Sequence, residues 1–459
     1  MYKINFNKPA HLHFIGIGGI SMSGLAQVLL DRGFTISGSD RASSPLTEHL
    51  SSLGAIIKIG QCAENITNDI DAVVYTAAIH KDNPEFRAAV EMNIPMLTRA
   101  ELLGQLMTNY ETSVAVSGTH GKTTTTSMLT EILLKENTDP TISVGGILHS
   151  IGGNIRVGKG PSFVTEACEY TNSFLSLFPT IGIILNIEED HLDFFKDIND
   201  IRKSFTEFAH KIPQNGLLVI NNDIDNVTEI TKGLKCPVST YSSTGNADFT
   251  ATDITYDELG HPSYDLVENG EKTLHIKLSV TGIHNVSNSL AVIAVCRHMG
   301  ISDTSIANGL SSFTGTDRRF EYKGKIGNVT IIDDYAHHPT EIKATLTAAK
   351  NYPHNKIWCA FQPHTYTRTK AFFSDFAKAL SLADNVLLLD IYAARETDTL
   401  GVSSELLSEE IKKYNPNSHY FESFDEAETF LLRECNDGDL IITMGAGDIY
   451  KLGEKLLGK

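Results

Sequence analysis

The stretch from Ser113 to Asn137 constrains this chain more than any other. Residues 113–117 read S-V-A-V-S, an apolar run typical of a short buried strand, and residues 118–123 read G-T-H-G-K-T. Beyond this turn, apolar residues recur at helical spacing, namely Met128, Leu129, Ile132 and Leu133. The sequence therefore predicts a strand, a glycine turn and a helix in immediate succession.

Residues 118–124, here called the phosphate loop, have the chemistry of an anion site. Backbone N–H groups and the helix dipole favour an anion at a helix start, and glycine allows the backbone to approach it closely. In this pattern Lys122 reaches the outer phosphates and the Thr123 hydroxyl binds Mg²⁺. The spacing G-x-x-G-K-T is two residues shorter than the common P-loop, and the alternative is a Gly-Lys turn that only caps a helix.

Length and composition set wider limits. A chain of 459 residues is too long for one core and suggests about three domains. The contents of 41% hydrophobic and 20% charged residues are ordinary for a soluble globular protein. No apolar run approaches the ~20 residues that span a bilayer, and no secretory signal is recognisable. We expect a cytoplasmic protein without membrane insertion.

The charge and the cysteines exclude two further classes. The net charge of -18 argues against a nucleic-acid partner bound through a general basic surface. The 6 cysteines contain no C-x-x-C pair. They indicate reduced thiols rather than a disulfide or zinc framework.

The N-terminal region predicts a β-α-β unit. A strand over 11–15 leads into G-I-G-G-I-S-M-S-G at 16–24, then into a helix and a second strand that ends near Asp40. A glycine turn followed by an acid is similar to the Rossmann fingerprint. The residues alone leave open a dinucleotide site, a mononucleotide-sugar site and a turn without a ligand. A later strand is predicted over 71–78, and a domain boundary near residue 110.

Two more predicted strands end next to ionisable groups. Glu166 ends the run S-F-V-T-E, and His191 follows the run I-G-I-I-L-N. Ligands of open α/β sheets bind at the carboxyl ends of the strands. Both side chains are therefore candidate ligands for a nucleotide-bound metal. The alternatives are a solvated or capping acid and a surface histidine.

The next region changes character. Residues 247–279 predict an antiparallel group of strands, and Gly282 opens a helix that runs to Met299. Asn285 and Asn288 lie at the start of that helix, where they could contact a base or cap the helix.

The last region predicts a third α/β domain with a mostly parallel sheet, after a boundary within 313–321. One strand ends in D-D-Y-A-H-H-P and another in Q-P-H-T-Y-T-R. The second contains Arg368, whose guanidinium can hold a carboxylate with two parallel hydrogen bonds. The alternative is a surface arginine paired with an acid such as Asp375.

Five motifs in this order resemble the Mur ligase family of peptidoglycan synthesis: G-T-H-G-K-T, E-A-C-E-Y, N-I-x-x-D-H-L-D, H-N-V-x-N and D-D-Y-A-H-H-P. The resemblance covers the chain from His11 to Asp448. It implies an α/β protein of three domains. These are a Rossmann-like UDP-substrate domain (1–109), a central P-loop-type ATPase domain (110–316) and a C-terminal Rossmann-like ligase domain (317–459).

The resemblance also implies roles for individual residues. The implied catalytic residues are Lys122, Glu166, His191 and Arg368. The implied Mg²⁺ ligands are Thr123, Glu166 and His191. The implied ATP contacts are Gly118, Thr119, His120, Gly121, Lys122, Thr123, Thr124, Asn285, Asn288, Arg319, Asp334 and His337. The implied substrate contacts are Gly18, Gly19, Ser21, His364 and Arg368. Lys203 lies near the D-H-L-D motif but at a spacing that assigns it no role.

Within the family, G-I-G-G-I-S-M-S-G and F-Q-P-H-T-Y-T-R resemble the ligases that act on UDP-N-acetylmuramate and L-alanine. The implied reaction converts the sugar carboxylate with ATP into an acyl phosphate, which the amine of L-alanine attacks. Three alternatives remain: a family member that joins a whole tripeptide to the same sugar nucleotide, a nicotinamide dehydrogenase, and a non-catalytic nucleotide-binding module.

Overall fold

The computed structural model describes residues 2–76, 78–394, 396–397 and 400–459. The chain divides into two compact units, each described below by itself. The first unit contains Met1–Ile187, Arg202–Ser239 and Val295–Ser305, and the second contains Glu188–Ile201, Thr240–Ala294 and Ile306–Lys459.

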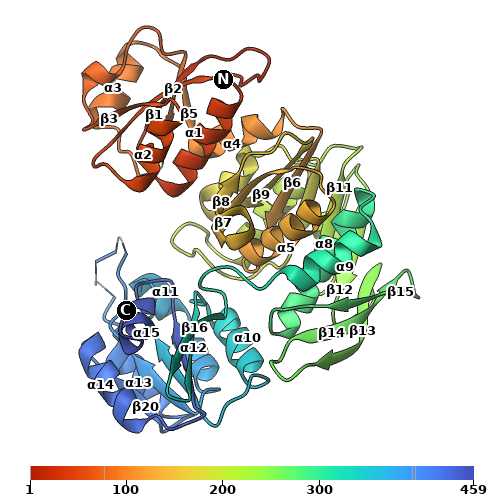
Figure 1. The fold of residues 1–459 in the computed structure, drawn as a ribbon, viewed down its shortest axis with the longest axis vertical. Helices are drawn as coiled ribbons and strands as arrows, with labels where there is room; N and C mark the ends of the chain where they lie inside the picture. Colours follow the sequence, from red (N-terminus) through yellow and green to blue (C-terminus); the bar gives the residue numbers. More distant parts are fainter. Residues whose placement is uncertain (1, 77, 395, 398–399) are drawn as a thin grey trace. The chain divides into compact units, whose positions relative to one another are not determined.

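The first unit begins with the predicted Rossmann-like sheet (Figure 1). Its strands lie in the order β3-β2-β1-β4-β5 and every neighbouring pair is parallel. The bounds are β1 His11–Ile15, β2 Thr35–Asp40, β3 Ile56–Ile59, β4 Ala72–Tyr75 and β5 Met96–Thr98. The strand predicted over 71–78 is β4, and residue 77 of that prediction lies outside the described residues.

The helices of this sheet begin where the sequence supplies caps. They are α1 Ile20–Asp31, α2 Pro45–Ser52, α3 Pro84–Glu91 and α4 Arg99–Met107, with a 3₁₀ turn at Ala63–Asn65. Ser44, Asn83 and Thr98 each accept an N–H of the first turn of the helix that follows. Such side chains replace hydrogen bonds that a helix start cannot make internally.

The rest of the first unit is built on a second sheet, whose strands here follow the order β11-β10-β6-β9-β7-β8. β6, β9, β10, β11 and β7 run parallel, and β8 is antiparallel to β7. The bounds are β6 Thr112–Ser117, β7 Thr141–Leu148, β8 Gly153–Arg156, β9 Ser162–Ala167, β10 Ile181–Ile184 and β11 Leu217–Asn221. The predicted helix after the phosphate loop is α5 Lys122–Lys135.

Shorter elements complete this region. They are the 3₁₀ turns His149–Ile151 and Tyr170–Ser176, and the helices α6 Ile198–Ala209 and α7 Val227–Thr231. The central strands β6, β9 and β10 bury Val114, Val116, Phe163 and Ile183 completely. Near-continuous apolar strands of this kind are typical of parallel sheets covered on both faces.

The second unit contains the predicted antiparallel strands, drawn in green in Figure 1. β13 Phe249–Tyr256, β14 Pro262–Glu268 and β15 Glu271–Lys277 pair antiparallel in sequence order, and β13 is also parallel to β12 Val238–Ser242. The helices α8 Ile283–His298 and α9 Asp303–Ser312 follow, and their residues within 295–305 belong to the first unit.

The C-terminal sheet of the second unit has the order β16-β17-β21-β18-β19-β20. All neighbours are parallel except β16, which pairs antiparallel with β17. The bounds are β16 Glu321–Ile326, β17 Val329–Asp334, β18 Ile357–Phe361, β19 Asn385–Leu388, β20 Ser418–Tyr420 and β21 Leu440–Met444. The prediction of a third, mostly parallel α/β domain is confirmed.

The helices described around this sheet are α10 Pro339–Ala349, α11 Tyr366–Ala371, α12 Phe373–Leu380, α13 Ser404–Ile411, α14 Phe424–Glu434 and α15 Tyr450–Leu456. Core residues gather in two clusters, one that includes Phe361 and Phe376 and one that includes Trp358 and Leu431. Among the described residues of the whole chain, none of the helices combines the length and the apolar character needed to span a membrane.

Candidate active site

The phosphate loop depends on two glycines with left-handed backbone. Gly118 has φ +142° and Gly121 has φ +83°, and α5 begins immediately afterwards at Lys122. A Cβ on Gly118 would lie 2.9 Å from the Cβ of Leu185. A side chain at Gly118 is therefore excluded by both conformation and space.

Asn186, two residues after the end of β10, holds the phosphate loop through three hydrogen bonds. Its amide oxygen accepts from the N–H of His120 at 2.8 Å, and its amide nitrogen donates to the His120 carbonyl at 3.1 Å. The N–H of Thr119 donates to the Asn186 carbonyl at 3.3 Å. Asn186 opens the N-I-x-x-D-H-L-D motif, but no role was predicted for it from the sequence.

Lys122 is engaged inside the loop. Its Nζ donates to the carbonyls of Gly118 at 2.5 Å and Thr119 at 3.1 Å, and to Glu169 Oε2 at 3.0 Å. Burial lowers the pKa of Lys122, but the carboxylate of Glu169 and the charge of Glu166 raise it above its usual value. The ammonium group therefore stays charged. Glu169 was not predicted as a site residue, although it belongs to the motif E-A-C-E-Y.

Glu166 lies beside the loop at the end of β9. It is paired in register with Val116 of β6, and its Oε1 accepts from the N–H of Gly145 at 2.5 Å. Thr123 is nearly buried in the first turn of α5, followed by Thr124. The hydroxyl of Thr123 and the carboxylate of Glu166 are oxygen donors, the type of ligand that Mg²⁺ prefers.

The N-terminal glycine turn is braced by the acid predicted at the end of β2. Gly18 N–H donates to Asp40 Oδ2 at 2.8 Å, while the N–H groups of Gly16 and Ile17 donate to the Ser39 carbonyl. Gly19 precedes α1, and Ser21 Oγ accepts from Arg99 at 3.1 Å. The turn therefore brings together all three of its predicted substrate residues, Gly18, Gly19 and Ser21.

In the second unit, Arg368 of α11 forms a buried ion pair with Asp190. Its Nε and Nη2 donate to Asp190 Oδ1 at 3.1 and 2.9 Å, and Nη1 donates to His364 Nδ1 at 3.2 Å. The side chains are only 11% and 8% exposed. The alternative of a surface pair with Asp375 is wrong, because Asp375 lies 3.7 Å from Lys378 at the surface instead.

Two histidines predicted for the site lie around this pair. The N–H of His191 donates to Asp190 Oδ1 at 2.8 Å, and the ring of His337 lies 6.0 Å from that of His364. Burial lowers the pKa of His337 to about 4, although Glu341 opposes the shift. Burial alone would raise the pKa of Asp190, but Arg368 and both histidines hold it well below its usual range. Asp190 is therefore ionised and His337 neutral at pH 7.

The remaining predicted ATP contacts also lie in the second unit. Asn285 Nδ2 donates to the Thr281 carbonyl at 2.8 Å, and Asn288 Nδ2 donates to Asn285 Oδ1 at 3.1 Å. Within the described residues, neither amide accepts an N–H from the start of α8, so the capping interpretation is wrong.

Asp334 and Arg319 lie at the end of β17 and just before β16. Asp334 is buried and accepts the N–H groups of Phe320 at 2.9 Å and Ala336 at 2.7 Å. Burial raises its pKa to about 6, although Arg319 opposes the shift. The guanidinium of Arg319 lies 5.3 Å from the centre of the Tyr335 ring.

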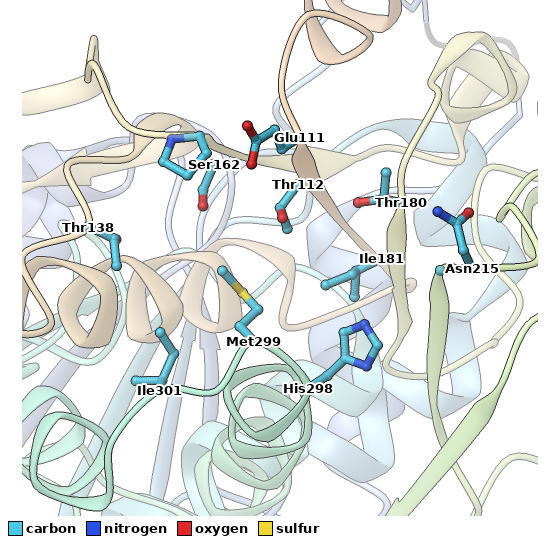
Figure 2. A pocket seen from close by; sticks show the side chains of 12 residues that line it. Glu111, Thr112, Thr138, Ser162, Thr180, Ile181, Asn215, His298, Met299 and Ile301 are labelled. Atoms are coloured by element: carbon cyan, nitrogen blue, oxygen red, sulfur yellow. The ribbon is translucent and has the colours of Figure 1, made fainter.

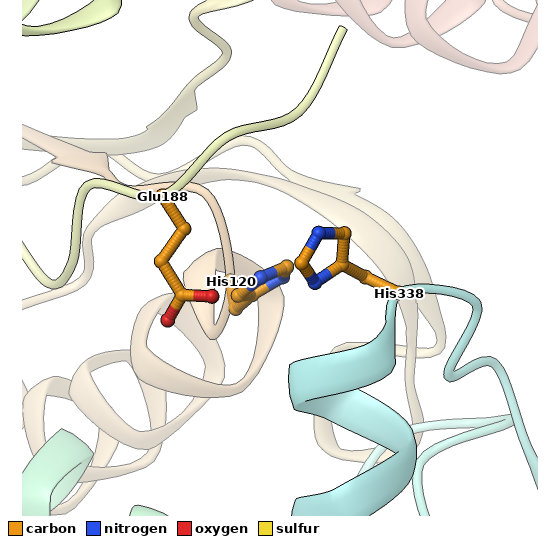
Figure 3. A group of neighbouring side chains, drawn as sticks. All are labelled: His120, Glu188 and His338. Atoms are coloured by element: carbon orange, nitrogen blue, oxygen red, sulfur yellow. The ribbon is translucent and has the colours of Figure 1, made fainter. Parts of the chain in front are cut away.

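The segment before Asp190 is hydrogen-bonded to the start of α10, and Figure 3 shows Glu188 of this segment and His338 at the start of α10. Thr340 Oγ1 donates to Glu188 Oε2 at 2.5 Å, and His338 Nε2 donates to the Glu189 carbonyl at 3.1 Å. His338 Nδ1 accepts from the Thr340 N–H at 3.3 Å, which is consistent with a neutral ring protonated at Nε2. These contacts fix the position of Asp190 along the chain.

A cavity of about 500 Å³ lies at the amino ends of the central strands of the second sheet in the first unit (Figure 2). Thr112, Ser162 and Ile181, the first residues of β6, β9 and β10, line it together with Met299 and Ile301. The phosphate loop follows the opposite, carboxyl end of β6. None of the predicted site residues lines this cavity.

Comparison with known proteins gives the same family over the whole chain. Residues 11–111 match the Mur ligase family catalytic domain, residues 116–296 the Mur ligase middle domain, and residues 318–447 the Mur ligase glutamate ligase domain.

Two relatives, both named UDP-N-acetylmuramate–L-alanine ligase, come from Lachnospira eligens (61% identical) and Agathobacter rectalis (59%), each matching over 100% of both chains. The structure of a UDP-N-acetylmuramate–alanine ligase from Thermotoga maritima is 29% identical over 98% of both chains, with a TM-score of 0.79. A murein peptide ligase from Psychrobacter arcticus is 26% identical over 98% of both, with a TM-score of 0.68. The chain therefore belongs to the Mur ligase family, among its UDP-N-acetylmuramate–L-alanine ligases.

Proposed function

We infer that the chain joins L-alanine to the carboxylate of UDP-N-acetylmuramate in peptidoglycan precursor synthesis, with conversion of ATP into ADP and phosphate. The observation that carries this inference is the full-length identity of 61% to a relative named for these two substrates. The chemistry of each unit taken by itself supports the inference, since the first unit carries a phosphate loop and the second a buried arginine suited to a carboxylate.

The reaction requires an activated carboxylate. A carboxylate is a poor acyl donor because its leaving group would be oxide, whereas an acyl phosphate releases phosphate. ATP supplies the phosphoryl group, the amine of L-alanine attacks the acyl carbon, and the tetrahedral intermediate expels phosphate. Catalysis of phosphoryl transfer is mainly positioning and charge stabilisation.

Lys122 is our proposed contact to the transferring phosphoryl group, together with the backbone of the phosphate loop. The loop residues Gly118, Thr119, His120, Gly121 and Thr124 hold the phosphates. From the second unit we propose Asn285, Asn288, Arg319, Asp334 and His337 as further ATP contacts. Alanine variants of these five residues of the second unit should each raise the KM for ATP.

Thr123, Glu166 and His191 are the proposed ligands of Mg²⁺. The ion would neutralise phosphate charge when bound, and the oxygen donors of Thr123 and Glu166 suit it. Glu166→Ala and His191→Ala should each require more Mg²⁺ for half-maximal rate. An unchanged Mg²⁺ titration in both variants would show that these side chains are structural.

The glycine turn at Gly18, Gly19 and Ser21 is our proposed site for the UDP diphosphate. The turn precedes the start of α1, where the helix dipole stabilises an anion. Calorimetry should detect UDP-N-acetylmuramate and not NAD. Tight NAD binding without a response to the sugar nucleotide would instead support the dehydrogenase alternative.

Arg368, with His364 beside it, is the proposed holder of the L-alanine carboxylate. The decisive experiment measures phosphate release with ATP and UDP-N-acetylmuramate, comparing L-alanine with the tripeptide. We expect L-alanine to be used. Preference for the tripeptide would establish the recycling ligase instead.

We also propose that the reaction takes place in the cytoplasm and that the domains extend over 1–109, 110–316 and 317–459. Limited proteolysis should cut first near residues 110 and 317. Fragments with other ends would redraw these limits.

A further inference from the structure

Arg368 donates in two different directions. The Nε–H and one N–H of Nη2 form one edge of the guanidinium, and both point to Asp190 Oδ1. The contact from Nη1 goes to His364 Nδ1. Because a guanidinium only donates, this Nδ1 must accept, so the proton of a neutral His364 lies on Nε2.

A guanidinium carries five N–H groups. Within the described part of the chain, the three bonds above leave one N–H on each terminal nitrogen of Arg368. Where the bond to His364 uses the Nη1–H on the Cδ side, the two remaining N–H groups share the terminal edge and can hold a carboxylate through parallel hydrogen bonds. Arg368 can therefore bind a carboxylate without releasing Asp190.

Asp190 itself is held firmly. Its Oδ1 also accepts from the N–H of His191, a residue with the left-handed φ of +53°. Thr365, which precedes α11 and Arg368, has φ +68°, an uncommon conformation for a β-branched residue. Such backbone is found where the surrounding structure fixes a functional arrangement.

We propose that Asp190 is a positioning residue for the amino acid substrate: it fixes one edge of the Arg368 guanidinium and directs the opposite, terminal edge to the L-alanine carboxylate. This proposal rests on the proposed function, because it assigns the carboxylate site to Arg368. It gives Asp190, the first acid of the D-H-L-D motif, a specific role that is separate from metal binding.

If Asp190 acts by positioning Arg368, removing its charge should change the KM for L-alanine in one direction. If Asp190 acts through its charge alone, the KM should change in the opposite direction. Removing the Asp190 charge leaves the arginine unneutralised, which by charge alone would strengthen its attraction for a carboxylate. If Asp190 instead orients the guanidinium, Asp190→Asn weakens binding of L-alanine because a neutral amide oxygen holds the guanidinium less firmly than the carboxylate does. The sign of the change in KM for L-alanine therefore separates the two roles.

The test is steady-state phosphate release by the full-length enzyme. Asp190→Asn should raise the KM for L-alanine at least about tenfold, with the KM values for ATP and UDP-N-acetylmuramate and the Mg²⁺ demand changed less than about twofold. The neighbouring exposed Glu189→Gln is the matched control, because it removes the same charge from the same segment. It should leave every constant unchanged.

Two further variants keep the proposal falsifiable if Asp190→Asn folds poorly. Asp190→Glu keeps the charge but displaces the carboxylate, and it too should raise the KM for L-alanine. In the Arg368→Lys background, Asp190→Asn should have little further effect, since the two residues act as one unit. A lower or unchanged KM for L-alanine in folded Asp190 variants, or multiplying effects with Arg368→Lys, would overturn the proposal.

The proposed function is tested separately by wild-type turnover with L-alanine. The pairing of Asp190 with Arg368 is tested without turnover by ¹⁵N NMR of arginine side chains. The Nε–H of Arg368 should exchange faster with solvent in Asp190→Asn than in the wild type, and at the wild-type rate in Glu189→Gln. Rapid exchange of this proton already in the wild type would contradict the positioning role.

Discussion

The first and second units each contain a buried ion pair around a cation predicted for the reaction, and the two cations are used differently. Lys122 lies 3.0 Å from Glu169 in the first unit, and Arg368 lies 2.9 Å from Asp190 in the second. An ammonium group has three N–H donors, and contacts with Gly118, Thr119 and Glu169 account for all of them. The guanidinium still has two to offer.

This difference has a consequence for binding. In the proposed roles, Lys122 gives up a partner to contact a phosphate, whereas Arg368 receives a carboxylate with its acid still in place. Lysine is a compact point charge on a flexible stem, and arginine is a rigid planar group. We therefore expect Glu169 to compete with the ligand of Lys122 and Asp190 to assist the ligand of Arg368.

The largest expected effect is that of Lys122→Ala. Removal of a charge that stabilises the transferring phosphoryl group should lower kcat by about 10²–10³-fold or more. The measurement is phosphate release with ATP, UDP-N-acetylmuramate and L-alanine, with thermal unfolding as the test of folding. Exposed Lys135→Ala in the same helix should be neutral. Near-normal turnover by a folded Lys122→Ala variant would remove this lysine from the mechanism.

Arg368→Ala should have the next largest effect. Loss of one member of a buried charged pair typically costs about 2–5 kcal/mol, so the rate at low L-alanine should fall at least about tenfold. Arg368→Lys should recover only part of it, because an ammonium cannot reproduce the two parallel bonds. Arg433→Ala serves as the control, since that arginine is 67% exposed. An unchanged dependence on L-alanine in both Arg368 variants would assign Arg368 a structural role.

Glu169→Gln should have a smaller effect, opposite in sign to that of Asp190→Asn. Without the carboxylate, Lys122 leaves its resting position more easily, so the KM for ATP should fall roughly threefold, or about 0.7 kcal/mol. Without ATP, the melting temperature of Glu169→Gln should be lower than that of the wild type, because the buried lysine loses its partner. Saturating ATP should reduce the difference between the two melting temperatures. A higher KM for ATP would mean that Glu169 assists the ligand, and the contrast between the pairs would disappear.

The smallest expected effect concerns stability and pH. His337, beside the Arg368 pair, has a pKa lowered by burial to about 4. The unfolded chain, with a histidine pKa near 6.5, binds this proton more readily. The contribution of His337 to the free energy of unfolding is therefore fully present above about pH 6.5 and is lost as the pH falls toward 4.

His337→Gln removes this contribution. Its free energy of unfolding should fall less than that of the wild type between pH 7 and pH 5, by up to about 2 kcal/mol. Urea titrations at both pH values measure the difference. Asp334, with its pKa raised to about 6, acts in the opposite direction in both proteins. Parallel losses in the two proteins would show that His337 also titrates normally in the folded state.

Much of the fold follows from local sequence. The strand, turn and helix over 112–135 were predictable because a short apolar run, two glycines and a helical repeat each specify one conformation. The polar residues at the carboxyl ends of the C-terminal strands were also predictable, because they directly follow short apolar runs in the sequence. Short edge strands such as β16 and β20 were not predicted, because their sequences alternate weakly and pairing with a neighbour decides them.

The roles proposed for single residues required more than the motifs. Asn285 seemed suited to capping by its position, yet its amide donates to Thr281. Asp375 seemed a plausible partner for Arg368 because it is near in sequence, but α12 directs it to Lys378 at the surface. Proximity along the chain is a weak guide here, since a helix determines which side chains share a face.

The sequence by itself determined which chemical groups this protein carries and the edge of each sheet where they gather, because strand direction and glycine conformation are local properties. Only the tertiary structure decided their partners. Arg368 and Asp190 are 178 residues apart, and Lys122 and Glu169 are 47 apart. A hydrogen bond forms only within about 3 Å, and packing of distant elements brings groups to that distance. The fold therefore decides which cation keeps a free edge for its ligand and which must exchange partners.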